Sequence, residues 1–149
     1  VFCTHLHIDH VGWNTVLENG QWKPTFPNAT YFLPRIDNQF WDPAGPHFAG
    51  MNGAAVNVNV YEDSVLPVIE AGQAVFVDDG DEIAPGMNAR SAPGHTPGQM
   101  VLEVTDGNDV AMFTGDILHH PMQIYRPDWN SVYCEDRQLA SSTRRAVLE

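Results

Sequence analysis

Histidine and aspartate side chains are concentrated in the opening stretch THLHIDH, residues 4–10. His5, His7 and His10 are three of the chain's seven histidines, and Asp9 stands among them. On an extended segment His5 and His7 point the same way, so they can bind one metal ion. Asp9 and His10 come where the chain turns towards its next element, and they can face a second ion. Imidazole and carboxylate ligands without a nearby thiolate suit Zn²⁺, Fe²⁺ or Mn²⁺ better than a soft metal ion.

Two later segments offer further ligands for such a site. SAPGHTPGQ, residues 91–99, places His95 in a tight loop rich in Pro and Gly. MFTGDILHH, residues 112–120, places Asp116 directly after an apolar strand. One carboxylate can bridge two cations, and four titratable groups within residues 5–10 are costly to bury without a partner such as a metal. The combined set therefore predicts a metal centre.

Length and composition indicate one globular α/β or β-rich domain. The chain has 149 residues, of which 43% are hydrophobic, and a formal net charge of −12. This charge disfavours nucleic acid and anionic membrane surfaces as partners. No apolar run reaches the roughly 18 residues of a membrane helix. Cys3 and Cys134 are expected to be buried thiols rather than a disulfide, which slightly favours a cytoplasmic location.

The elements that must position these residues are short strands and a few helices. Arg144 and Arg145 are expected on a solvated face of the last helix or as salt-bridge partners of the surplus acidic residues. Residues 44–60 are expected to form a long loop that could act as a lid. Apolar spacing predicts strands at 1–4, 29–34, 74–77, 88–92, 100–104 and 109–115, a hairpin turn at 105–109, and helices at 11–19, 35–42, 61–72 (restarting at Pro67) and 136–149.

Aromatic and apolar residues near these loops are candidate substrate contacts. Trp13 follows the histidine-rich stretch, and Phe48 and Met51 lie in the long loop. Core packing explains all three equally well. The aromatic-rich segment 124–136 is expected beside the site, with its aromatic side chains engaged in packing.

The motifs resemble those of a known family. HLHIDH, residues 5–10, matches the HxHxDH motif of the metallo-β-lactamase superfamily, PGHTPGQ (93–99) resembles its third motif and FTGDILHH (113–120) its fourth. The resemblance covers essentially the whole chain. It implies an α/β (α+β) fold, namely a partial αββα sandwich. It also implies that residues 1–149 form a single truncated domain. We expect the first strands and the C-terminal end of the sandwich to be missing, because the chain begins within a strand and stops within a helix.

The resemblance also implies a ligand set. His5, His7 and His95 would hold the first metal ion, Asp9 and His10 the second, and Asp116 would bridge both. Family members complete the second site with one more histidine, and no residue after His120 can supply it. We attribute this to truncation of the chain.

The resemblance favours hydrolysis, because oxygen-reducing di-iron relatives carry Glu in place of His7. Three residues after the bridging aspartate, where quorum-signal lactonases carry Tyr and organophosphate-cleaving relatives a histidine, this chain has His119. We therefore predict cleavage of a lactone, ester or phosphotriester by water whose pKa two divalent ions lower towards 7. Asp9 would orient this water and carry its proton, and His119 would donate a hydrogen bond to the leaving group.

Other functions stay open at this point. The thiol-ester-cleaving and antibiotic-cleaving branches fit the same motifs. A metal-binding module without turnover would keep the ligands and lose activity, and an iron-dependent redox enzyme would use the same fold. The sequence leaves the oligomeric state and the compartment undetermined.

Overall fold

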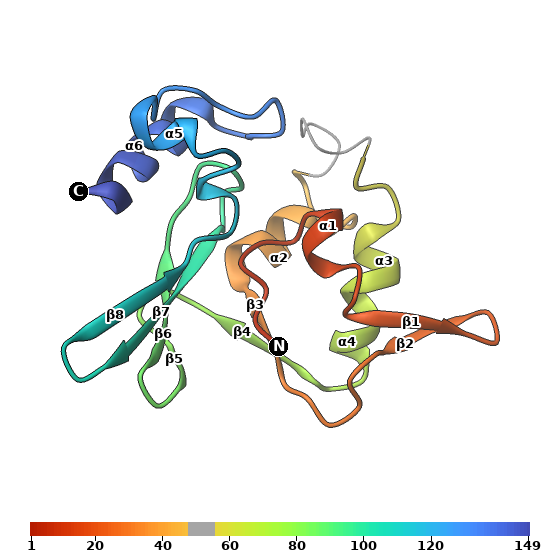
Figure 1. Ribbon diagram of the computed structural model, residues 1–149. Coiled ribbons are helices and arrows are strands. Elements are labelled where there is room, and N and C mark those ends of the chain that lie inside the picture. Colours follow the sequence, from red (N-terminus) through yellow and green to blue (C-terminus); the bar gives the residue numbers. More distant parts are fainter. Residues whose placement is uncertain (48–55) are drawn as a thin grey trace.

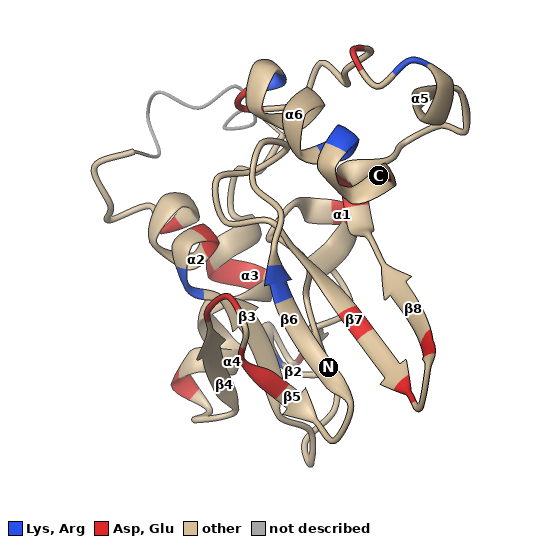
Figure 2. Ribbon diagram, turned by 90° about the vertical axis from the view of Figure 1, so that its left-hand side faces the viewer, with Lys and Arg blue, Asp and Glu red and all other residues tan. Residues whose placement is uncertain are grey.

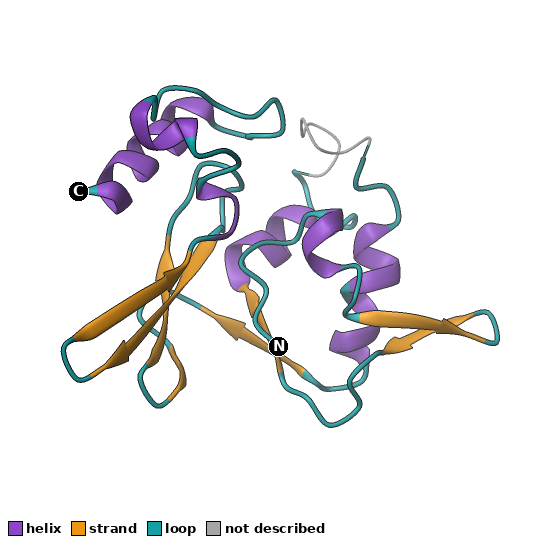
Figure 3. Ribbon diagram, in the orientation of Figure 1, coloured by secondary structure: helices purple, strands orange, loops and turns teal. Residues whose placement is uncertain are grey.

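The computed structural model describes residues 1–47 and 56–149 (Figure 1). Its helices and strands form two groups, one around β3, β4 and the helices α1 to α4, and one around the sheet β5 to β8 with α5 and α6 above it (Figure 3). In chain order the elements are α1 (Ile8–Val11), β1 (Thr15–Glu18), β2 (Gln21–Pro24), β3 (Tyr31–Pro34), α2 (Arg35–Trp41), α3 (Val60–Ser64), α4 (Leu66–Glu70), β4 (Ala74–Val77), β5 (Glu82–Ala84), β6 (Met87–Ser91), β7 (Met100–Asp106), β8 (Asp109–Phe113), η2 (Gly115–Ile117), α5 (Met122–Tyr125) and α6 (Arg137–Leu148).

The first group is built on a parallel pair of strands. β3 and β4 pair in parallel, and the chain between them passes through α2, α3 and α4. Parallel strands need such a long crossover connection. Tyr31, Leu33, Trp41, Val65 and Val68 are buried in the core of this group. Fully burying side chains of this size contributes about 1.5–3 kcal/mol each, so this cluster holds together elements from both sides of the long loop.

Residues 1–4 join the two groups. Phe2 forms an isolated parallel bridge with Phe32, and the Cys3 amide donates to the Phe32 carbonyl at 3.0 Å. On the other side the Thr4 carbonyl accepts from the Met100 amide at 2.8 Å. The predicted strand at 1–4 is therefore reduced to a single bridge, but it places the histidine-rich stretch between β3 and β7.

The second group is a four-stranded antiparallel sheet in the order β5-β6-β7-β8. The predicted turn at 105–109 is confirmed, because Asp106 pairs with Asp109 across a two-residue connection. α6 begins as predicted, with the Asp136 side chain accepting a hydrogen bond from the Leu139 amide at 2.8 Å. Such an N-cap satisfies one of the free amides at the helix start.

The predicted helix at 11–19 is wrong. α1 ends at Val11, and the chain continues into the antiparallel hairpin of β1 and β2. Asn19 and Gly20 form its two-residue turn with φ of 52° and 79°. Asn-Gly is a strong hairpin signal, and here it overrides an apolar spacing that resembles a helix. The strands β2 and β5 were not predicted either.

Most of the other local predictions are confirmed. α2 covers the predicted helix at 35–42, and α3 and α4 divide the predicted helix at 61–72 near Pro67. Part of the predicted loop at 44–60, with Phe48 and Met51, lies outside the described residues.

Acidic positions are spread over helices and strands of both groups, with few basic positions between them (Figure 2). No described helix has both the length and the apolar character needed to span a membrane.

Candidate metal centre

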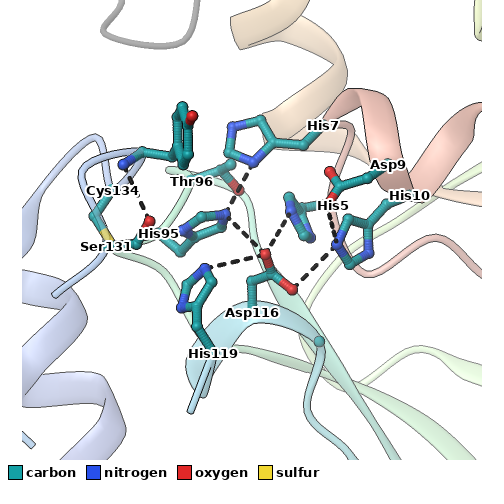
Figure 4. A network of polar contacts seen from close by, with 12 residues as sticks. His5, His7, Asp9, His10, His95, Thr96, Asp116, His119, Ser131 and Cys134 are labelled. Carbon is teal, nitrogen blue, oxygen red and sulfur yellow. Dashed lines mark hydrogen bonds and ion pairs between the residues drawn. The ribbon is translucent and has the colours of Figure 1, made fainter. Parts of the chain in front are cut away.

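Three separate loops carry the candidate site residues. His5 and His7 lie on the segment leading into α1, His7 is the N-cap residue of α1, and His10 lies within it. His95 lies on the loop between β6 and β7, and Asp116 lies in η2, directly after β8. Figure 4 shows these side chains converging around the carboxylate of Asp116.

The carboxylate of Asp116 is the centre of the cluster. Its Oδ1 lies 3.1 Å from His10 Nε2. Its Oδ2 lies 3.1 Å from His119 Nε2 and 3.4 Å from His95 Nε2. His5 Nε2 is 4.0 Å from the same oxygen. One carboxylate thus faces four imidazoles, with His10 on one oxygen and the others on the second.

The imidazoles of His5, His7 and His95 are buried and mutually close. His95 Nε2 lies 2.9 Å from His7 Nδ1. Among the described residues, Nε2 of His5 and Nε2 of His7 are buried without a hydrogen-bond partner. An unsatisfied buried polar atom costs about 1–3 kcal/mol. His5 Nε2 faces Asp116 Oδ2 at 4.0 Å, so this atom points into the cluster and needs a ligand to satisfy it.

Burial keeps these three histidines neutral. It lowers the pKa of His5 well below its usual range, that of His7 to about 4 and that of His95 to about 3. A neutral imidazole has a free lone pair, which is the form that binds a metal ion. At neutral pH the three rings are therefore already in the binding state.

Asp116 and His10 form the charged part of the cluster. Burial opposes ionisation of Asp116, but hydrogen bonds from His10 and His119 outweigh it and hold the pKa of its carboxyl well below the usual range. The hydrogen bond to Asp116 in turn raises the pKa of His10, against the effect of its partial burial. The carboxylate therefore stays ionised over the whole physiological pH range.

The donor set fits divalent cations. Within each of three groups the nitrogen and oxygen atoms lie within 4.8 Å of one another. The groups are His5, His7 and His95; His5, His10 and Asp116; and His95, Asp116 and His119. Zn²⁺ commonly takes three protein ligands of this kind and leaves one position open. A cation here would also satisfy the free Nε2 of His5.

Asp9 stands apart from these groups. Its side chain is 73% exposed, and its Oδ2 lies 3.8 Å from His10 Nε2. The structure therefore brings Asp9 to the rim of the cluster rather than to its centre. His120 is exposed, and its Nδ1 accepts a hydrogen bond from the Met122 amide, as expected for a residue outside the cluster.

A pocket of about 460 Å³ opens onto the cluster. Ser131 and Tyr133 belong to its wall, although the sequence predicts only packing for the aromatic residues of their segment. Trp13 is 81% exposed and is not part of the wall, so neither role considered for it is supported. The lining residues are His7, Ile8, Asp9, Val56, Asn57, His95, Asp116, His119, Ser131 and Tyr133.

Two buried side chains hold the loops that carry the cluster. Cys134 Sγ lies 3.5 Å from His95 Nδ1, and both cysteines are buried, as predicted. The prediction of a solvated Arg144 is wrong, because this side chain is 0% exposed and donates to the Ile117 carbonyl at 2.6 Å. Apolar helix spacing does not reveal that loop carbonyls cover this position. Arg145 is exposed, as predicted.

Comparison with known proteins identifies the class to which this fold and site belong. The family model of the metallo-beta-lactamase superfamily matches residues 1–149. The chain therefore belongs to the metallo-beta-lactamase superfamily, and the predicted fold class is confirmed. No curated protein matches the chain.

Solved structures show the same fold. The hydrolase AbOPH of the beta-lactamase superfamily has 28% identity and a TM-score of 0.84, with 98% of this chain and 50% of that chain covered. AidC, a dizinc quorum-quenching lactonase, has 28% identity and a TM-score of 0.77, with 98% and 51% covered. A probable metal-dependent hydrolase from Staphylococcus aureus has 18% identity and a TM-score of 0.73, with 97% and 47% covered. The chain thus spans about half the length of the solved structures it matches.

Proposed function

We propose that this chain carries the metal centre of a hydrolase that cleaves a lactone, ester or phosphotriester. His5, His7 and His95 would hold one divalent ion, Asp9 and His10 a second, and Asp116 would bridge them. The observation that carries the proposal is the convergence of three buried, neutral imidazoles beside an ionised carboxylate at the base of a pocket. Zinc is the preferred ion, because the ligands are imidazoles and carboxylates.

When bound, the divalent ions supply a Lewis acid and lower the pKa of water, so that hydroxide is available at neutral pH. The chain's own residues then have separate tasks. Asp116 contributes a carboxylate that is already ionised, and the three neutral imidazoles need not lose protons. Asp9, exposed in the pocket wall, is placed to accept a proton and pass it to the leaving group. His119 can donate a hydrogen bond to a substrate that displaces it from Asp116.

The substrate class is supported by the pocket and by the relatives. Ile8, Val56 and Tyr133 add apolar surface to a wall whose other members are polar, which suits a small molecule with an apolar group beside the bond to be cleaved. AbOPH and AidC, both 28% identical to this chain, are described as a hydrolase and as a dizinc lactonase.

Metal titration and substrate assays on the full chain test the proposal. We expect the chelator-treated protein to bind about two equivalents of Zn²⁺ and to hydrolyse a lactone, an aryl ester or a phosphotriester only when loaded. Asp116→Asn should lower kcat/KM at least about 100-fold, because it removes a charge shared by both ions. His120→Asn is the matched control, since this exposed histidine lies outside the cluster, and it should leave activity unchanged.

The alternatives have distinct outcomes in the same experiment. Zinc binding without hydrolysis of any member of the panel would overturn the enzymatic proposal in favour of a metal-binding module. Retention of iron together with oxygen consumption would overturn it in favour of a redox enzyme.

A further inference from the structure

Asp37 is a buried carboxylate on α2 for which the sequence motifs predict no role. It is 0% exposed, and its side chain accepts hydrogen bonds from two different loops. The Leu6 amide donates to Oδ2 at 3.0 Å, and the Gly98 amide donates to Oδ1 at 2.7 Å. The Thr96 hydroxyl also donates to Oδ2, at 3.0 Å. One side chain therefore connects segments that are 31 to 61 residues away in sequence.

These contacts fall next to the candidate ligands. Leu6 lies between His5 and His7, and Thr96 follows His95 directly. Each hydrogen bond thus holds the main chain within one to three residues of an imidazole. Because the bonds from both loops end on the same carboxyl group, Asp37 sets the separation between the two segments.

The His95 loop approaches α2 so closely at Gly98 that no side chain fits between them. A Cβ added at Gly98 would lie 2.2 Å from the Asp37 amide nitrogen and 2.8 Å from Oδ1. Only a glycine allows the loop to reach the carboxylate from this side. The backbone of the His95 loop therefore packs directly against the backbone of α2. This close contact restricts the distance between the loop and the helix.

Stability alone does not explain a carboxylate at this place. Every hydrogen bond described for its oxygens comes from a neutral donor, and burial raises the pKa of Asp37 to about 6. Burying an ionised group in this way costs free energy, and apolar replacements of buried charges are often equally stable. A role in arranging the loops accounts for its position better than a contribution to the core.

We propose that Asp37 is a positioning residue that holds the His5–His7 segment and the His95 loop at the separation needed for one cation. The inference rests on the ligand set of the proposed function, and it concerns the arrangement of the ligands before any ion binds.

Asp37→Asn tests this in the full chain. The amide side chain keeps one oxygen and turns an NH₂ group towards donors of the loops. In the metal-free protein we expect hydrogen exchange at the Leu6 and Gly98 amides to become about 10- to 100-fold faster. In competition with a chelator, the affinity for Zn²⁺ should fall by about 10-fold or more. Unchanged exchange at both amides would overturn the proposal, as would faster exchange with unchanged Zn²⁺ affinity.

Tyr61→Phe is the matched control. The Tyr61 hydroxyl donates to Asn38 Oδ1 at 2.9 Å, so this variant removes a hydrogen bond to the same helix and leaves the hydrogen bonds of Asp37 to both loops in place. It should change neither the exchange of Leu6 and Gly98 nor the affinity for Zn²⁺. A fall in affinity equal to that of Asp37→Asn would show a general effect on α2 and would overturn the proposal.

Thr96 supplies the test if Asp37→Asn does not fold. Thr96→Val removes one of the three hydrogen bonds and should lower Zn²⁺ affinity about 3- to 10-fold, whereas Thr96→Ser keeps the hydroxyl and should restore it. Equal affinities in these two variants would overturn the proposal. None of these measurements uses turnover, so a protein that shows them but hydrolyses no substrate would retain Asp37 as a positioning residue and lose the proposed function.

Discussion

The histidines around Asp116 are of two electrostatic kinds. His5, His7 and His95 are kept neutral by burial, whereas the hydrogen bond to Asp116 favours the protonated form of His10. Without a cation, His10 supplies the positive charge beside the carboxylate. A metal ion bound at His10 would therefore have to displace its proton, so the affinity of that proposed site should depend more on pH than that of the three neutral imidazoles.

The same shifts predict that acid destabilises the metal-free protein. In the unfolded chain histidine takes up a proton near its ordinary pKa of about 6.5. His7 and His95 do so in the folded chain only at about 4 and about 3, and His5 also at a strongly lowered pKa. Below pH 6.5 the unfolded state binds more protons, so the stability from these groups is lost as the pH falls. Urea unfolding of the chelator-treated protein should show a free energy of unfolding lower by about 3 kcal/mol at pH 4.5 than at pH 7.

Two groups act in the opposite direction and limit this loss. The pKa of His10 is raised, so its stabilisation is complete below about 6.5 and lost as the pH rises through the raised value. The pKa of Asp37 is raised to about 6, so below that pH the folded state binds a proton that the unfolded state does not yet bind. This difference also favours the folded state as the pH falls. A free energy of unfolding that stays level or rises from pH 7 to pH 4.5 would contradict the prediction.

At the scale of elements, the His95 loop is packed against the start of α6 through a glycine. Gly94 has φ of +133°, and a Cβ there would lie 2.3 Å from the Ala140 amide nitrogen. The Gly94 carbonyl also accepts a hydrogen bond from the Asp136 amide at 3.0 Å. The loop can approach α6 this closely only because position 94 has no side chain.

Gly94→Ala should therefore destabilise the protein strongly. We expect a loss of about 2–5 kcal/mol, which combines backbone strain with overpacking against α6. Gly20→Ala is the matched control, because Gly20 also has a positive φ, of +79°, but a Cβ there meets nothing within 4 Å. This control should cost only the strain, about 1–2 kcal/mol. Chemical unfolding measures both variants, and equal losses would show that the close contact is unimportant.

At the scale of the whole molecule, Arg144 links α6 to the segment that carries Asp116. Its guanidinium donates to the carbonyls of Ile117, Pro127 and Trp129 at 2.6, 2.5 and 3.0 Å. Ile117 follows Asp116 directly, and Trp129 precedes the segment that forms the pocket wall. One buried cation thus joins three parts of the chain that are separate in sequence.

Arg144→Met should cost about 3 kcal/mol or more, because it leaves buried carbonyls without donors. Arg145→Met should change the free energy of unfolding by no more than about 0.5 kcal/mol, since this neighbour on the same helix is exposed. Thermal and urea unfolding of the two variants check the difference. Similar stability of both would indicate that the carbonyls find other partners.

Local patterns predicted the elements whose formation depends on neighbours in sequence. The β7–β8 hairpin, α2 and the break between α3 and α4 near Pro67 follow from turn residues and apolar spacing. The predicted helix at 11–19 is wrong because the Asn19-Gly20 turn favours a hairpin over the helix that the apolar spacing indicates. The strand at 1–4 shrank to one bridge because pairing depends on partners far along the chain.

The sequence by itself determined the family and the chemical types of the candidate ligands, because the motifs keep these residues at short, recognisable spacings. Only the tertiary structure decided which of them meet. It gathered the histidines on Asp116, left Asp9 at the rim, and revealed Asp37 and Arg144, whose partners come from distant loops. The physical reason is that a buried polar group is specified by the donors and acceptors around it, and these are assembled by folding rather than by position along the chain.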